Sequence, residues 1–361
     1  MLKALSVTSL SLALAAIFAA SGTATSPAEA ATKYCDGPKL TWKISLFGKR
    51  RAVTEGVEYI SQYAKDQTCD KFDYKIYYGE QLSKAKENLD GIKVGALEGG
   101  YVCASYHPGK LRALGVLDLP FLPIYDFDSM TKVYDTLWER KELIDSLARW
   151  GAKRHLQTIL PRYEYMGRGT PPKTLEDFKG KRLRALGGMG EAAKEIGAVP
   201  TTMPAPETYT ALQRGTVDAV GFPFSYTFAA YKLDEISTWY TTNMSAGMVN
   251  CITAISQSAW EKLPKQYQAI LDEALPGAYK AMIDAYGKED KINLPKWEKE
   301  GKMTAVTFSE AELAKFQRVG GKPVWDKWVQ ETKEEVPTAQ ALLDLVLKTA
   351  ADLNKSKSAK K

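Results

Sequence analysis

The chain has 361 residues, of which 45% are hydrophobic, 11% aromatic and 25% charged, and its net charge is +6. This composition is typical of a folded globular protein and excludes an intrinsically disordered chain. The positive excess is scattered, so we expect no nucleic-acid partner, although a mildly positive field helps to collect anionic solutes. The one like-charge cluster follows Leu353, where we expect the chain to fray. Its members are Lys355, Lys357, Lys360 and Lys361.

The N-terminal segment has the pattern of a secretory signal peptide. Lys3 precedes an apolar run from Ala4 to Ala20, and the small-residue pattern Ala28-Glu29-Ala30 follows at the distance of a cleavage site. An uncleaved anchor helix is the alternative, which the length of the run, about 17 residues, disfavours. We therefore predict a signal peptide over residues 1–30, cleavage near Ala30, and export to the periplasm.

The four cysteines suit an exported chain, in which an even count invites disulfides. Cys35 and Cys69 each stand just before a predicted strand of one β-α-β unit, and neighbouring strand starts make them a candidate disulfide. Cys103 and Cys251 lie within apolar strands. For this second pair the sequence leaves open a disulfide or two buried free thiols.

Hydrophobic periodicity predicts an α/β protein. Residues 40–46 and 72–78 alternate apolar and polar around a helical pattern over 53–64, which predicts an opening β-α-β unit with parallel strands. The other predicted elements, in chain order, are a helix over 83–94, a strand over 99–105, a connecting segment over 116–121, helices within 129–150, strands over 154–160 and 181–186, helices over 191–196 and 206–215, strands over 217–222 and 249–255, a long helical region kinked at Pro276, a strand over 303–308, and helices to 353.

Two blocks of alternating strands and helices predict two lobes with a ligand cleft between them. We assign residues 31–122 and 250–308 to lobe I and residues 123–249 to lobe II. Residues 309–361 form C-terminal helices that pack across the lobes. The chain should cross between lobes near Leu122 and near Asn250, and these crossings are the expected hinge.

The usual catalytic and metal-binding motifs are missing from the sequence. It has two histidines, His107 and His155, and no H-E-x-x-H, C-x-x-C or G-x-S-x-G motif, so we expect no metal, no cofactor and no enzymatic activity. The segment Gly188-Met189-Gly190-Glu191-Ala192-Ala193 matches the dinucleotide pattern G-x-G-x-x-A, but it lies in mid-chain of an exported protein. Glycines at a helix start also let backbone N–H groups approach an anion, so Gly188 is a candidate ligand contact.

Several segments, taken in order, resemble the periplasmic solute receptors of tripartite ATP-independent periplasmic (TRAP) transporters, the DctP-like family. The segment Asp177–Arg184, DFKGKRLR, is similar to the family's "DLKGLKIR". The remaining matches are Tyr78–Leu82 and Gly91–Ala96 upstream, Gly197–Pro200 and Glu207–Asp218 after it, and Trp260–Pro264 downstream. Each match is loose by itself, but together they span nearly the whole mature chain. The resemblance implies a class II-like two-lobed periplasmic binding protein fold with a helical C-terminal region.

The resemblance also implies the function and one binding residue. The chain should bind a small organic carboxylate outside the cytoplasm and deliver it to the membrane subunits of a TRAP transporter. By position, Arg184 matches the family arginine that grips the ligand carboxylate. A guanidinium suits this role because it is planar, permanently charged and able to bind a carboxylate through two hydrogen bonds.

The sequence departs from the family at two expected ligand contacts. Phe222 stands where the family often has an asparagine, and a second family arginine falls near Tyr163, where Arg162 or Arg168 could substitute. We therefore expect an aromatic pocket wall and a ligand that is an aromatic or partly apolar acid, with keto acids and sugar acids still open. The candidate ligand-binding residues are Arg184, Phe222, Tyr163, Tyr165, Arg168, Phe47, Gly188 and Tyr226.

Three alternatives to this function stay open on the sequence alone. The receptor of an ATP-driven (ABC) importer shares the two-lobed fold. A periplasmic enzyme could use the carboxylates Glu207 and Asp218, although their spacing implies no geometry. A sensor subunit could present its ligand to a membrane kinase. For the receptor we expect a monomer.

Overall fold

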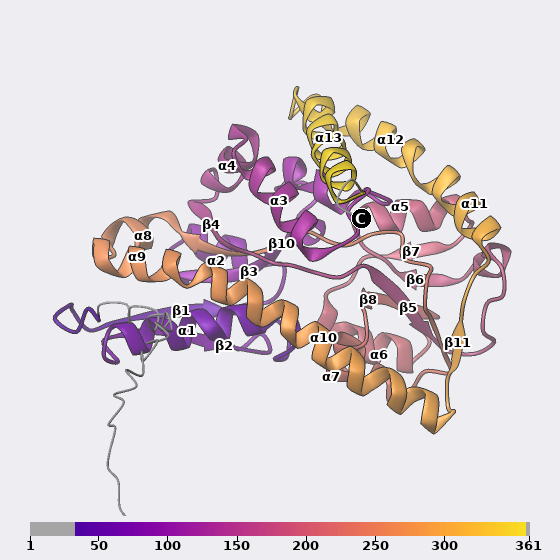
Figure 1. The fold of residues 1–361 in the computed structure, drawn as a ribbon, viewed down its shortest axis with the longest axis horizontal. Coiled ribbons are helices and arrows are strands. Elements are labelled where there is room, and N and C mark those ends of the chain that lie inside the picture. Colours follow the sequence, from indigo (N-terminus) through magenta and orange to yellow (C-terminus); the bar gives the residue numbers. More distant parts are fainter. Residues whose placement is uncertain (1–32, 359–361) are drawn as a thin grey trace, which may run out of the picture. The chain divides into compact units, whose positions relative to one another are not determined.

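The computed structural model describes residues 33–358, so the predicted signal peptide and its cleavage site lie outside the described residues. Within these residues the chain forms two β-sheets with helices packed around them, as Figure 1 shows. This architecture confirms the predicted α/β class with two sheets.

The first sheet has the strand order β2-β1-β3-β10-β4. Its strands are β1 (Leu40–Ser45), β2 (Phe72–Tyr77), β3 (Gly99–Cys103), β4 (Ala152–Gln157) and β10 (Cys251–Ser256). The predicted opening unit is confirmed, because β1 pairs with β2 in parallel and helix α1 (Glu55–Gln67) connects them. One face of α1 is buried through Val57, Ile60 and Ala64, which follow each other at helical spacing. Strand β10 is antiparallel to both of its neighbours.

The second sheet has the strand order β11-β9-β5-β8-β6-β7. Its strands are β5 (Tyr163–Gly167), β6 (Arg182–Arg184), β7 (Val199–Thr201), β8 (Ala219–Pro223), β9 (Trp239–Thr241) and β11 (Thr304–Val306). Strands β6, β7 and β8 are parallel, whereas β5 is antiparallel to β8 and β9. Three of these strands, β5, β7 and β9, are absent from the sequence prediction.

Helices cover the two sheets. Their bounds are α2 (Asn88–Lys93), α3 (Phe127–Trp138), α4 (Lys141–Ala148), α5 (Gly187–Glu195), α6 (Thr208–Gln213), α7 (Tyr226–Ala230), α8 (Gln257–Lys262), α9 (Lys265–Glu273), α10 (Leu275–Glu300), α11 (Glu310–Gly320), α12 (Lys322–Thr332) and α13 (Ala339–Ser358). Short 3-10 helices include η1 (Ala52–Thr54), η2 (Ala104–Tyr106), η3 (Arg112–Asp118), η4 (Leu175–Phe178), η5 (Ala205–Glu207) and η6 (Leu233–Glu235). Among residues 33–358, no helix is long and apolar enough to cross a bilayer.

Two segments lie in a different sheet from the one that the predicted lobe boundaries imply. Strand β4, assigned to lobe II, pairs with β10 in the first sheet. Strand β11, assigned to lobe I, pairs with β9 in the second sheet. The partners β10 and β9 are distant in sequence from these strands, so local patterns could not place either one.

The chain crosses between the sheets along two adjacent linkers. After β4 it passes to the second sheet at residues 158–162, and it returns to the first sheet at residues 242–250. The sequence places the crossings between lobes near Leu122 and near Asn250, and the second of these positions falls within the returning linker. The two linkers are hydrogen bonded to each other near both ends. The Thr158 amide donates to the Cys251 carbonyl at 3.0 Å, and the Tyr163 amide donates to the Gly247 carbonyl at 2.8 Å.

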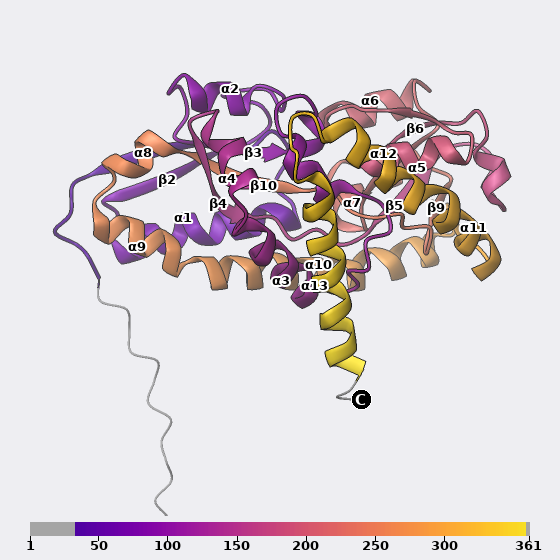
Figure 2. The ribbon, with the colours of Figure 1, turned by 90° about the horizontal axis from the view of Figure 1, so that it is seen from above.

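A third connection runs along α10, which packs on α1 beside the first sheet and on α7 beside the second. Its 26 residues correspond to about 39 Å at 1.5 Å per residue. Figure 1 shows this helix extending from the α9 end toward β11, and Figure 2 shows the same long helix from above. Pro276 lies in the first turn of α10, where its missing N–H costs no hydrogen bond, so the helical region is divided before Pro276 rather than kinked there.

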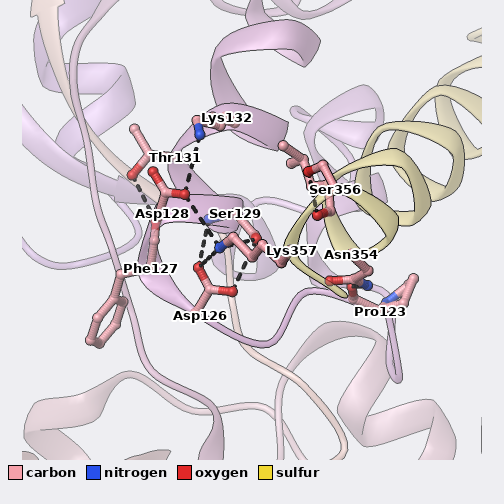
Figure 3. A network of polar contacts seen from close by, with 11 residues as sticks. Pro123, Asp126, Phe127, Asp128, Ser129, Thr131, Lys132, Asn354, Ser356 and Lys357 are labelled. Atoms are coloured by element: carbon pink, nitrogen blue, oxygen red, sulfur yellow. Dashed lines mark hydrogen bonds and ion pairs between the residues drawn. The ribbon is translucent and has the colours of Figure 1, made fainter. Parts of the chain in front are cut away.

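The C-terminal helices contact elements beside both sheets: α11 and α12 pack on α5, and α13 packs on α3. Part of the segment that was expected to fray is helical: α13 continues to Ser358, and Lys357 contacts the start of α3 (Figure 3). The Lys357 ammonium lies 2.6 Å from an Asp126 carboxylate oxygen and 3.3 Å from one of Asp128. Asn354 also donates to the Pro123 carbonyl at 2.9 Å.

All four cysteines form disulfides. The predicted Cys35–Cys69 bridge is confirmed, and it joins the segments that precede β1 and β2. The open question about the second pair is settled by the register of β3 and β10, which places Cys103 directly opposite Cys251 in a second disulfide.

Candidate functional site

A small central cavity lies between the two sheets and takes side chains from both. Its volume is about 30 Å³, enough for about two water molecules. The first sheet and the segments that follow its strands contribute Phe47, Arg51, Val53, Tyr101, Cys103, Tyr106 and Cys251. The second sheet and its connections contribute Tyr163, Arg184, Leu186, Ala205, Phe222, Pro223 and Thr227. Leu160 and Val249 of the two linkers complete the wall.

Several residues of this wall stand at or just after the ends of strands. Arg184 is the last residue of β6, and Phe47 follows β1 by two residues. Cys103 is the last residue of β3. The carboxyl ends of strands in the two sheets therefore face one cavity, which is where ligands bind in open α/β sheets.

Arg184 is almost completely buried, with 1% of its surface exposed. Its Nε donates to the Met203 carbonyl at 3.2 Å and its Nη1 donates to the Gly221 carbonyl at 2.6 Å. Its Nη2 donates to the Tyr106 hydroxyl at 3.0 Å. A guanidinium has five N–H groups, so these three bonds leave one on each terminal nitrogen. The arginine fork is thus fixed in place with two donors unused.

No carboxylate within residues 33–358 forms an ion pair with Arg184. The face of the Phe222 ring lies against it instead, with the ring centroid 4.3 Å from the Arg184 Cζ. Burying a cation without a counterion costs several kcal/mol, whereas an anion that enters the cavity would remove most of that cost. The site is therefore electrostatically prepared for an acid.

Tyr106 joins the two sides of the cavity. It stands in η2 after β3, and its hydroxyl accepts hydrogen bonds from Arg184 and from the Ala205 amide, which is also 3.0 Å away. Both donors come from the second-sheet side. Tyr106 is therefore a polar contact across the cavity that holds the Arg184 fork from the opposite sheet.

Four of the predicted site residues come together at the cavity: Arg184, Phe222, Tyr163 and Phe47. The Phe222 ring stacks on Tyr231 with centroids 5.6 Å apart and lies edge-on to Phe228 at 5.9 Å. This aromatic packing fixes the orientation of Phe222 under the guanidinium. The roles of Arg184, Phe222, Tyr163 and Phe47 as ligand contacts stay predictions.

Tyr165 and Arg168 do not line the cavity. Strand β5 runs away from the linker at 158–162, so Tyr165 lies further along it, where its ring packs against Phe178. Arg168 follows the end of β5 and donates to the Leu212 carbonyl at 3.2 Å and to the Gln213 carbonyl at 2.6 Å. These bonds satisfy carbonyls at the end of α6, which explains Arg168 as a helix-capping side chain.

Arg162 and Tyr226 also lie outside the wall. Arg162 donates to the Leu122 carbonyl at 3.1 Å and lies over the Tyr125 ring. Tyr226 is half-buried at the start of α7, and its neighbour Thr227 takes the place in the cavity wall.

Gly188 does not line the central cavity; it stands at a close backbone contact and lines a second, larger groove. A Cβ at this position would lie 2.6 Å from the Asp118 carbonyl oxygen and 2.6 Å from Cδ of Pro120. The glycine is required because α5 packs directly on the backbone after η3. The G-x-G-x-x-A pattern is explained by this packing.

A larger groove, with a volume of about 500 Å³, lies beside the central cavity, between η2, η3, the start of α5 and α12. Two of its three lining cations are paired with acids: Lys327 lies 2.5 Å from Glu191, and Arg112 lies 2.8 Å from Glu335, whereas Lys86 forms no ion pair within residues 33–358. The groove is larger than the central cavity, but two of its three cations are already neutralised by acids, so an anion would gain less electrostatic stabilisation from them than from the buried, unpaired Arg184.

The carboxylates and histidines that an enzyme would use lie outside the central cavity. Glu207 and Asp218 are not in the central wall, and Asp218 pairs with the exposed Arg182 at 2.7 Å. His155 is buried among Tyr74 and Trp260. Within residues 33–358 no three His, Cys, Asp or Glu side chains are grouped so that they could hold a metal ion.

Sequence reasoning missed Arg51, which lines the cavity from the first sheet. It is 5% exposed, and its Nη1 donates to the Lys49 carbonyl at 2.6 Å. The available signal was an arginine in the loop that follows the first strand of a β-α-β unit, a position where ligands bind.

Two buried carboxyl groups near the linkers predict a pH dependence of stability. Asp118 accepts a hydrogen bond from the Asn250 amide, and burial raises the pKa of Asp118 from 3.8 to about 8. Burial likewise raises the pKa of Glu164 to about 7, although Thr241, Met244 and Ser245 donate to it. Above pH 4 the unfolded chain loses these protons while the folded chain keeps them. Stability should therefore fall as pH rises from about 4 to about 8.

Urea unfolding between pH 5 and pH 7.5 measures this effect. Each retained proton contributes up to about 1.4 kcal/mol per pH unit to the slope. Asp118→Asn should reduce the slope by up to that amount, and Asp344→Asn, on the exposed face of α13, is the control. An unchanged slope in Asp118→Asn would show that this carboxyl is already ionised in the folded protein.

Comparison with known proteins gives the family. Residues 46–332 match the family "Bacterial extracellular solute-binding protein, family 7" (DctP). A solute-binding protein of Albidiferax ferrireducens is 26% identical over 260 residues, 70% of this chain and 74% of the relative. The C4-dicarboxylate-binding periplasmic protein of Rhodobacter capsulatus is 26% identical over 224 residues, 61% of this chain and 66% of the relative.

Solved structures support the same fold. A TRAP periplasmic solute-binding protein from Desulfovibrio salexigens, solved with bound orotic acid, superposes with a TM-score of 0.78 at 22% identity. The superposition covers 86% of this chain and 99% of that protein. The two sheets and the C-terminal helices are therefore those of a periplasmic binding protein, and the match over residues 46–332 shows that the chain belongs to family 7 of the bacterial extracellular solute-binding proteins.

Proposed function

We propose that this solute-binding protein captures a small organic carboxylate in the central cavity and delivers it to the membrane subunits of a TRAP transporter. The observation that carries the proposal is Arg184, a buried guanidinium with two unused donors and no acidic partner within the described residues. Two relatives support it, since the Rhodobacter capsulatus protein is named as C4-dicarboxylate-binding and the Desulfovibrio salexigens protein was solved with bound orotic acid. Phe47, Tyr163 and Phe222 are the proposed aromatic contacts.

The energetics require the two sheets to close on the ligand. A micromolar affinity corresponds to about −8 kcal/mol, and one charge-assisted pair supplies only about 1.5–3 kcal/mol. Burial of about 200 Å² of apolar surface against the aromatic wall would add about 5 kcal/mol. A cavity of about 30 Å³ cannot admit an acid without opening, so the linkers at 158–162 and 242–250 are the proposed hinge.

The proposed location is the periplasm, after cleavage near Ala30. Two disulfides that use every cysteine support an oxidising compartment. The intact mass of protein recovered from the periplasm tests the cleavage directly. The protein is proposed to act as a monomer, with the closed form recognised by the transporter.

Native mass spectrometry of freshly purified protein tests the proposed function. The expected result is a complex with one small acid, which after denaturation is detected as a carboxylate in negative-ion mode. Dialysed protein should then bind that acid again with 1:1 stoichiometry. A neutral or cationic solute in the complex would contradict the proposal.

A further inference from the structure

The central cavity contains a second buried arginine, contributed by the opposite sheet from Arg184. Arg51 follows β1 and precedes η1, and its side chain lies in the same cavity wall. It is 5% exposed. Within residues 33–358 its side chain makes one hydrogen bond, to the Lys49 carbonyl, out of the five N–H groups of a guanidinium.

Aromatic rings surround Arg51 in place of acids. The Arg51 Cζ lies 5.8 Å from the centroid of Phe47, 5.9 Å from that of Tyr101 and 5.7 Å from that of Tyr231. Ring faces attract a cation but carry no net negative charge. As with Arg184, no ion pair joins Arg51 to an acidic side chain in the described part of the chain.

Two cations that face one small cavity set the charge of the ligand that fits it. A single carboxylate on Arg184 would leave the Arg51 charge buried without a counterion, which is costly. A ligand with two anionic groups would neutralise both. Because the arginines come from opposite sheets, such a ligand would also join the sheets when they close.

We propose that Arg51 is a second ligand-binding residue, which receives a second anionic group of the organic acid held by Arg184. This inference rests on the proposed function, and it specifies that the bound acid carries two anionic groups. The first anionic group binds the second-sheet side through Arg184. The second binds the first-sheet side through Arg51, so that both groups are needed for full closure.

Calorimetry with matched pairs of acids tests this inference. The probes are succinate against butyrate, and isophthalate against benzoate, which differ within each pair mainly by one carboxylate. In at least one pair, the wild-type protein should bind the diacid about 10- to 100-fold more tightly, the range expected for one charge-assisted pair. Arg51→Gln should remove this preference by weakening the diacid much more than the monoacid, because only the diacid loses an ionic partner.

The variants also include Arg51→Lys, which keeps the charge but not the fork and should retain part of the preference. If Arg51→Gln does not fold, as judged by circular dichroism, the inference is tested by the affinities of the wild-type protein and of Arg51→Lys for the two acids of each pair. Equal affinities for monoacid and diacid in both pairs would overturn the inference and leave the proposed function intact. Equal weakening of both probes by Arg51→Gln would reduce Arg51 to a structural role. If none of the four acids binds, the acid identified from the native complex decides: an acid with a single anionic group would overturn this inference and leave the proposed function intact.

Discussion

Replacing Arg184 by alanine is expected to weaken binding of the acid by at least about 30-fold and, with full desolvation, by more than 1,000-fold. Truncating one member of a buried hydrogen-bonded charge pair costs about 2–5 kcal/mol, and each 1.4 kcal/mol is a factor of ten. Arg184 meets the condition because it is 1% exposed and fixed by three hydrogen bonds.

Arg182 supplies a matched control on the same short strand. It stands two residues earlier in β6, and its exposed side chain pairs with Asp218 at 2.7 Å. Exposed pairs contribute about 0–1 kcal/mol to stability, so Arg182→Ala should bind the acid within about twofold of wild type. Calorimetry with the acid identified from the native complex measures both variants. Affinity within threefold of wild type in Arg184→Ala would refute the assigned carboxylate contact.

The second large effect is expected from the Cys103–Cys251 disulfide, which closes a loop with a sequence separation of 148 residues. Chain entropy predicts a stabilisation that grows with loop length, approaching about 5 kcal/mol for loops of this size; measured values are commonly about 2–4 kcal/mol. The Cys103→Ala/Cys251→Ala variant should therefore lose about 2–5 kcal/mol of unfolding free energy. Urea denaturation measures this loss.

The two disulfides should differ in their effect on binding. Cys103 and Cys251 both line the central cavity, whereas Cys35 and Cys69 lie before β1 and β2 and are not part of its wall. Removing the Cys103–Cys251 bridge should weaken acid binding as well as stability. Removing the Cys35–Cys69 bridge should lower stability and leave the affinity unchanged. Equal affinity losses in both double variants would contradict this distinction.

Local patterns in the sequence were sufficient for the opening of the fold. Alternation over 40–46 and 72–78 predicted β1 and β2 because each strand has one face in the core. Strands β7 and β9 have only three residues each, too few to show alternation. The pairing of β4 with β10 also has no local signal, because it depends on a strand about 100 residues away.

Four of the eight candidate residues line the central cavity, and a family motif marked one of them. Arg184 followed from the segment Asp177–Arg184, and the cavity contains it. Tyr165 and Gly188 were proposed because their residue types suit a pocket, but neither lines the central cavity: β5 carries Tyr165 away from it, and the close approach of α5 to η3 places Gly188 beside the larger groove. The position of Arg51 after the first strand could be read from the sequence, but only the tertiary structure shows that its side chain is buried without an acidic partner.

The most direct test of the account is a crystal structure of the protein with its acid bound. The account predicts the acid in the central cavity, with a carboxylate within hydrogen-bond distance of both terminal nitrogens of Arg184 and the ring of Phe222 beside it. An acid bound instead in the groove between η3 and α12, with Arg184 still contacting only protein groups, would contradict it.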